Sequence, residues 1–183
     1  TPVVTERYVE WVSGGSFPAG RPAWETAGVI LTDDVTPYED RKLRMLNGAH
    51  TIRAIAGPRR GHETVDQAIA DPELRELVDA WWLEAGSTLP ADLDPAGYAD
   101  GLRERFANPA LKHRLSQIAE NMLVKIGSRI LPVIRERRAA GLTHAAGTRA
   151  LAEWALATGG DPLELDPEHD RAALDDALAA AKL

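Results

Sequence analysis

Apolar runs along the chain are bounded by a recurring helix-start signal, in which a hydrogen-bond-accepting side chain precedes a proline at the first helical position. The signal occurs at Thr36-Pro37, Asp71-Pro72, Asp94-Pro95, Asn108-Pro109 and Asp166-Pro167. Glu39 and Gln67 complete capping boxes with Thr36 and Thr64. The pattern predicts helices over 37–56, 65–70, 72–85, 95–106, 109–140, 143–158 and 167–182, with Gly127 and Pro132 dividing the fifth of these segments.

Residues 1–35 follow a different pattern, with short β-favouring pieces at 3–4, 8–12 and 29–31 among glycines and prolines. We expect them to form an N-terminal docking arm from a domain junction. A chain of 183 residues with 44% hydrophobic content can bury one sizeable core. The predicted fold class is therefore mainly α, with residues 36–183 forming one multi-helical domain.

Composition excludes several partners. The formal charge of −7 comes with no basic tract, so nucleic acid is not expected to bind. No apolar run approaches the roughly 18–20 residues of a membrane span, so no membrane partner is expected. The chain has no cysteine and no second histidine at metal spacing from His62, so we expect no metal. A reducing, cytoplasmic location is the simplest expectation.

The most informative stretch is residues 41–50, within the first long helix. At about 100° per residue, Lys42, Asn47 and His50 fall near 0°, 140° and 80°, so we expect them to share one side and converge on one pocket. Gly48, in the middle of this helix, indicates close approach by another backbone or a ligand. Together the three side chains could exchange a proton with a carbonyl or alcohol oxygen and polarise it. By spacing alone, a solvated helix face is the commoner explanation.

The Lys-x4-Asn-x2-His pattern resembles the lysine helix of the mannitol dehydrogenase family, the polyol-specific long-chain dehydrogenases and reductases. Three further stretches resemble the same family: 17–25, 34–39 and 105–114. Together the similarity covers residues 1 to about 132. The resemblance implies a zinc-independent, two-domain enzyme, in which a Rossmann-type N-terminal domain binds NAD or NADP and a helical C-terminal domain presents a polyol or sugar acid.

Carried over by position, the resemblance makes Lys42 the general acid/base, lets Asn47 hold the reacting oxygen and lets His50 bind a neighbouring hydroxyl. Lys125 resembles a second substrate-binding lysine. Its usual Asp-Gly-Ser-x-Lys element is replaced here, because residues 121–123 are Asn-Met-Leu. Gln117, eight residues before it, is typical of the sugar-acid reductases.

The sequence leaves open the roles of two arginines, the identity of the substrate and the class of protein. Arg129 could bind a substrate carboxylate, although a surface salt bridge is the commoner fate of such an arginine. Arg21 could face a cofactor or an acidic substrate, or could form an ion pair that holds the arm to the helices. Features of fructuronate reductase and of tagaturonate reductase both occur, so the substrate stays open, as do oligomeric state and the choice of NAD or NADP. The rival interpretation is a non-catalytic helical interaction module derived from the family.

No Gly-x-Gly-x-x-Gly follows a predicted strand, and Ser13-Gly14-Gly15-Ser16 lacks the required spacing. The Rossmann domain is thus expected to be absent from this chain. We predict that the chain alone is catalytically inactive.

Overall fold

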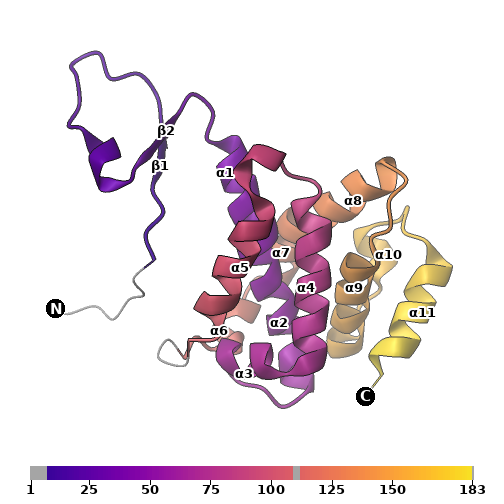
Figure 1. Cartoon of the computed structure of the whole chain (residues 1–183). Helices are drawn as coiled ribbons and strands as arrows, with labels where there is room; N and C mark the ends of the chain where they lie inside the picture. Colours follow the sequence, from indigo (N-terminus) through magenta and orange to yellow (C-terminus); the bar gives the residue numbers. More distant parts are fainter. Residues whose placement is uncertain (1–7, 109–111, 183) are drawn as a thin grey trace.

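The computed structural model describes residues 8–108 and 112–182. Figure 1 shows an extended N-terminal arm that projects from a bundle of helices. A long helical stretch crosses the centre of this bundle and consists of α1 (Thr36–Arg41), a π-helical segment η2 (Lys42–Asn47) and α2 (Gly48–Arg59). The mainly α fold expected from the sequence is confirmed.

The arm is a loop closed by two short parallel strands, β1 (Val12–Gly14) and β2 (Ile30–Thr32), in which Val12 pairs with Ile30. Between them lies one 3₁₀ turn, η1 (Trp24–Ala27). The loop has a small aromatic cluster of its own: the Trp24 ring stacks on Trp11 with centroids 5.9 Å apart and meets Phe17 edge-on at 5.5 Å. The strand expected at residues 3–4 lies outside the described residues.

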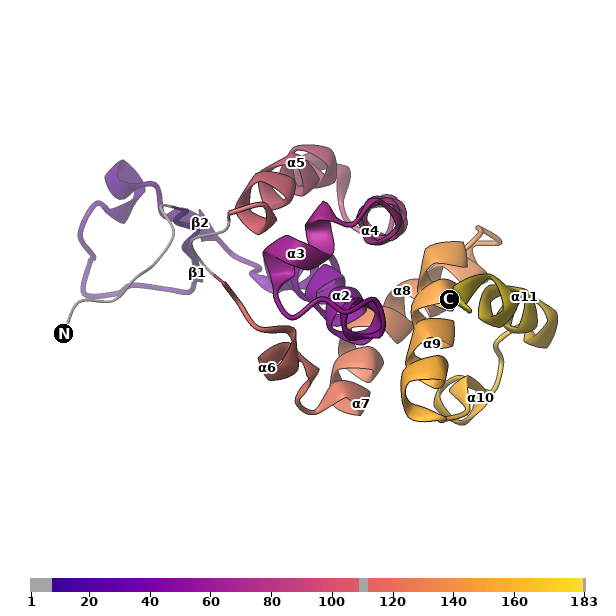
Figure 2. The same cartoon turned by 90° about the horizontal axis from the view of Figure 1, so that it is seen from below.

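The first layer of helices packs on one side of α2 (Figure 2). Its elements are α3 (Val65–Ala70), α4 (Pro72–Gly86), the 3₁₀ turn η3 (Ala91–Leu93) and α5 (Pro95–Phe106). The Thr64–Gln67 capping box and the Asp71 and Asp94 caps are confirmed, since each side chain accepts the expected backbone N–H.

The remaining helices lie on the other side of α2 and at the end of the bundle far from the arm (Figure 2). They are α6 (Leu115–Ala119), α7 (Met122–Lys125), a second π-helical segment η4 (Ile126–Ile130), α8 (Leu131–Ala139), α9 (Ala145–Thr158), α10 (Pro162–Leu165) and α11 (Arg171–Ala181). None of the helices in the described part of the chain is both long and apolar enough to cross a membrane.

Three helix-boundary predictions were wrong. Thr36 does not cap its helix: it is the first residue of α1, and its N–H donates to the Asp34 side chain at 2.9 Å. The last helix begins at Arg171 rather than at residue 167, because the Asp166 carboxylate is engaged by Arg138 and the helix is capped by Asp170 instead. Residues 112–140 form α6 and one continuous helical run of α7, η4 and α8, so the break falls at residues 120–121 rather than at Gly127 or Pro132, and the helix start expected at 109 lies outside the described residues.

The C-terminal helices are tied to α2 by a buried acid. Glu153 of α9 is fully buried, and its carboxylate accepts hydrogen bonds from Arg59, Arg60 and Arg149. Because two of these arginines belong to the end of α2 and its C-cap, this cluster fixes the position of α9 against the helix that carries the candidate chemistry.

Candidate functional site

The helix expected to carry the chemistry is interrupted by the π-helical segment η2, which begins at Lys42 and ends at Asn47. In a π-helix the backbone bonds join residues five apart, so Lys42 and Asn47 lie one turn apart on the same face. In an uninterrupted α-helix they would stand about 140° apart around the axis, on one side of the helix but less closely aligned. The π segment therefore improves the alignment that the sequence spacing suggested.

Two tryptophans of α4 stabilise this segment. The indole N–H of Trp81 donates to the Arg44 carbonyl oxygen at 2.9 Å, and that of Trp82 donates to the Met45 carbonyl oxygen at 3.1 Å. Both rings are buried in the core. They supply donors to carbonyl groups within the widened turn, where the regular helix ladder is broken.

Gly48 is required by the same contact. A Cβ atom at position 48 would lie 2.7 Å from Nε1 of Trp81. The sequence predicted close approach by a backbone or a ligand, whereas the approaching group is this side chain.

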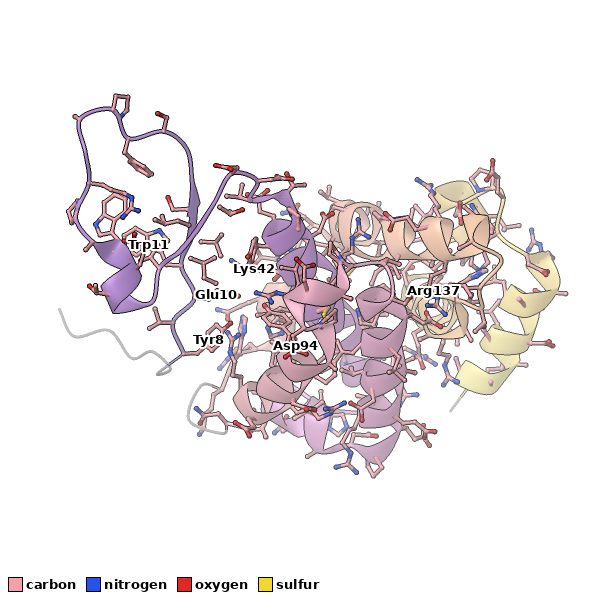
Figure 3. The ribbon with its side chains drawn as sticks, turned by 45° about the horizontal axis from the view of Figure 1, so that its top comes forward. Tyr8, Glu10, Trp11, Lys42, Asp94 and Arg137 are labelled. Atoms are coloured by element: carbon pink, nitrogen blue, oxygen red, sulfur yellow. The ribbon has the colours of Figure 1, made fainter. Side chains whose placement is uncertain are left out.

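Lys42 is exposed and lies where the arm meets the helices, next to Glu10 (Figure 3). It lines a hollow of about 290 Å³ together with Glu10, Trp11 and Val12 of the arm and with Tyr38 of α1. Within the described residues its amine forms no ion pair and no hydrogen bond. The amine is thus free to meet a ligand from the arm side.

Asn47 is half-buried, and its side-chain amide makes no hydrogen bond to the described residues. Its backbone carbonyl accepts from Thr51 at 2.9 Å and from Arg129 at 3.4 Å. The backbone of Asn47 is therefore held from two sides, while the amide is available to a ligand.

His50 lines a different hollow, a cavity of about 90 Å³ next to α5. Nη2 of Arg53 lies 3.5 Å from its Nδ1, and since arginine can only donate, Nδ1 accepts and Nε2 carries the proton. Burial, followed by the Arg53 charge, holds the pKa of His50 well below its ordinary value. The imidazole is neutral at pH 7 and can donate from Nε2.

The structure does not bring the three residues into one hollow. Lys42 lines the hollow beneath the arm, His50 lines the cavity beside α5, and Asn47 lies on the helix between them. The expected convergence was wrong in this respect. Their order along one helix is instead suited to an extended ligand that lies parallel to its axis.

Of the four other candidate residues, three lie on helices of the bundle and the fourth, Arg21, lies on the arm. Lys125 and Arg129 belong to α7 and η4, and η4 packs against η2. The Lys125 amine donates to the Ile118 carbonyl at 2.7 Å, and Arg129 donates to the Thr51 hydroxyl at 3.1 Å. Gln117 is exposed on α6. Arg129 thus contacts the Lys42 helix directly and forms no salt bridge within the described residues.

Arg21 lies far along the arm and makes a two-bond ion pair with Glu25, at 2.6 Å for each bond. This pair is internal to the arm, so it does not hold the arm to the helices. The attachment that sequence analysis missed is Arg41, which pairs with Glu10 at 2.5 Å and lies over the Tyr98 ring at 4.4 Å.

The arm does not provide the arrangement that binds a dinucleotide. A pyrophosphate site needs a glycine-rich turn that leads from a strand directly into a helix. After β1 ends at Gly14, the next helical element in the described chain is the 3₁₀ turn at Trp24–Ala27. No group of three or more His, Asp or Glu residues that could hold a metal ion occurs among the described residues.

Comparison with known proteins agrees with the sequence resemblance. The family model described as "Mannitol dehydrogenase C-terminal domain" matches residues 34–163. The uncharacterized oxidoreductase YeiQ of Escherichia coli is 44% identical over 71% of this chain and 27% of its own length. D-mannonate oxidoreductase of the same organism is 36% identical over 73% of this chain and 28% of its own length.

A solved structure shows the same fold. Mannitol 2-dehydrogenase from Pseudomonas fluorescens, in a ternary complex with NAD and D-mannitol, aligns with a TM-score of 0.73 and 30% identity, over 94% of this chain and 39% of that one. The matching part of the chain covers less than a third of the length of each of the two Escherichia coli relatives.

Proposed function

Because the chain belongs to the mannitol dehydrogenase family, we propose that it is the substrate-binding and catalytic-lysine part of an NAD(P)-dependent dehydrogenase that interconverts a polyol or an aldonate with its keto form. The observation that carries this proposal is the free amine of Lys42 in register with the free amide of Asn47 on a π-helical turn. π-helical turns occur frequently at functional sites.

The proposed chemistry of this chain is proton transfer. During oxidation the neutral amine of Lys42 takes the hydroxyl proton, while Asn47 donates a hydrogen bond to the same oxygen. In the reverse direction the ammonium of Lys42 returns the proton to the keto oxygen. A nicotinamide cofactor, when bound mainly by the enzyme's N-terminal Rossmann domain, would supply the hydride acceptor or donor.

His50, Lys125, Gln117 and Arg129 are proposed to hold the rest of the substrate. The Nε2–H of His50 is a neutral donor suited to a hydroxyl oxygen. Lys125 lies on the element that leads into η4, beside the Lys42 helix. Arg129 contacts the Asn47 carbonyl, so it also positions that residue.

The test is Lys42→Ala in the complete enzyme, with Lys182→Ala as control because that lysine is exposed at the far end of the chain. We expect turnover to fall by about 10²-fold or more, with a smaller effect on cofactor affinity. The control should behave as the parent. Near-normal turnover of Lys42→Ala would remove this lysine from the mechanism.

The 183-residue chain by itself is expected to be inactive, since its sequence contains no Gly-x-Gly-x-x-Gly and the described part of its arm forms no pyrophosphate-binding turn. NAD(P)-dependent oxidation of any polyol by this chain alone would contradict that expectation. The replaced Asp-Gly-Ser element favours the second candidate, a non-catalytic module, and inactivity of the complete protein on mannitol, arabinitol, mannonate and altronate would support it.

A further inference from the structure

Arg53 is a buried cation with no acidic partner among the residues that the structure describes. It lies within α2 with none of its surface exposed, and its guanidinium sits 3.6 Å from the centre of the Phe106 ring. Its Nε donates to the Ala49 carbonyl, its Nη2 faces His50, and its Nη1 has no hydrogen-bond partner in the described structure. A buried charge is costly unless an opposite charge accompanies it.

A cavity of about 90 Å³ beside α5 lies on the other side of the His50 and Phe106 side chains from this guanidinium. We call it the basic cavity, and its walls include His50, Asp66, Arg105, Phe106, Lys112 and His113. His50 and Phe106 both touch Arg53, and the His113 ring lies 5.4 Å from that of His50. The Arg53 charge therefore acts on the cavity through the groups that form its wall.

The positive charges around this cavity affect the pKa values of the two histidines in its wall. Burial and the Arg53 charge lower the pKa of both His50 and His113. Further positive charges act on His50 from Arg105 of α5 and Arg129 of η4, and Lys112 adds another to the wall. In a chain with a net charge of −7, this concentration of basic groups predicts an anionic ligand.

Asp66 is the one acid that lines the cavity among the described residues, and its Oδ1 is buried without a hydrogen-bond partner. This oxygen can only accept, so it calls for a ligand with a hydrogen to donate. A hydroxyl group next to a carboxylate meets both requirements, whereas an inorganic anion meets only the first.

We infer that the basic cavity binds the carboxylate end of a sugar acid, with Lys112 and His50 facing the anion, Arg53 adding its charge from behind His50 and Phe106, and Asp66 accepting a hydrogen bond from an adjacent hydroxyl. This assignment rests on the proposed function for the identity of the ligand as a substrate. Eight residues of one helix separate Lys42 from His50, about 12 Å along the axis. An extended open-chain acid together with the long lysine side chain can span that distance.

The arm passes both the basic cavity and the hollow that contains Lys42. At one end the Tyr8 ring covers Arg105 at 3.9 Å, and Arg105 lines the basic cavity. A few residues later, Glu10 and Trp11 line the hollow that contains Lys42. Residues 8–12 therefore run alongside the path that the sugar acid would follow.

The test measures ligand binding to the 183-residue chain, so it does not require turnover. The chain is titrated with D-gluconate, inorganic phosphate or mannitol, and the melting temperature and the His50 pKa from ¹⁵N NMR are followed. We expect gluconate to raise both, because a bound anion favours the charged imidazole, and mannitol to leave both unchanged. Tighter binding of phosphate than of gluconate, or an equal response to mannitol, would overturn the assignment.

Variants locate the site. Arg53→Met should weaken gluconate binding severalfold, because it removes a positive charge behind the cavity wall, without lowering the melting temperature of the free chain, because that charge is buried and unpaired among the described residues. Lys112→Gln changes only an exposed side chain and should weaken binding severalfold. Arg171→Met, which removes an exposed charge on α11, is the matched control and should bind as the parent does. Unchanged gluconate affinity in Lys112→Gln and in a folded Arg53→Met would place the anion elsewhere.

Discussion

Replacing Gly48 with alanine should destabilise the chain, although alanine is the better helix former. The gain in helix propensity is about 1 kcal/mol. Against it, the new Cβ would lie 2.7 Å from Nε1 of Trp81 and 3.0 Å from two further ring atoms, and such overpacking costs about 1–3 kcal/mol. Displacement of the ring from the Arg44 carbonyl leaves a buried hydrogen bond unmade, at a cost of about 1–3 kcal/mol. The net destabilisation is on the order of 2 kcal/mol.

The assay is urea unfolding followed by circular dichroism, with the free energies compared at equal m values. Gly101→Ala is the matched control, because Gly101 is also inside a helix but a Cβ there would meet nothing within 4 Å. It should stabilise the chain by about 0.5–1 kcal/mol. If both variants stabilise the chain equally, the Trp81 contact is not the reason for a glycine at position 48.

Two other predictions concern buried ionisable groups. Glu153→Gln should lower the free energy of unfolding by up to about 3 kcal/mol, since it removes the acidic partner of Arg59 and leaves Arg60 only its exposed partner Glu73; thermal melting measures this. Because the pKa of His50 is lowered in the folded chain, protonation favours unfolding, so stability should be constant above about pH 7 and decline as the pH falls below about 6.5. His50→Gln should make that decline shallower in urea unfolding at a series of pH values.

A specific outcome would contradict each of these two predictions. A melting temperature of Glu153→Gln within a degree of the parent would mean that the arginines find other partners. An identical pH dependence in His50→Gln and in the parent would assign the decline to other groups, of which His113 and His169 also have lowered pKa values.

Local signals in the sequence predicted the parts of the fold that depend on neighbouring residues. The caps at Asp71 and Asp94 and the capping box at Thr64 are such cases, because each side chain bonds to the backbone within the next three residues. The π-helical turn could not be predicted in this way. Its carbonyl groups are satisfied by tryptophans 37 positions away in the sequence.

The candidate site was predicted only in part, because its arrangement depends both on spacing within one helix and on packing between distant segments. The Lys42, Asn47 and His50 spacing follows from one helix, but their distribution over two hollows depends on where the arm and α5 pack. Arg53 was missed because an arginine within a helical pattern is ordinarily read as a surface residue. Its one recoverable signal was its position among the apolar residues Ile52, Ala54 and Ile55.

The described part of the arm meets the helices at several points: the covalent connection from β2 through residues 33–35 into α1, the ion pair between Glu10 and Arg41, and the contact of the Tyr8 ring with Arg105. A flap with a single hinge could swing freely, but a loop whose strands are paired and which is fastened at several points cannot. Any displacement of the arm must pull on α1 and hence on the turn that begins at Lys42. Docking of another domain onto the arm would in this way adjust the orientation of the lysine mechanically, without touching it.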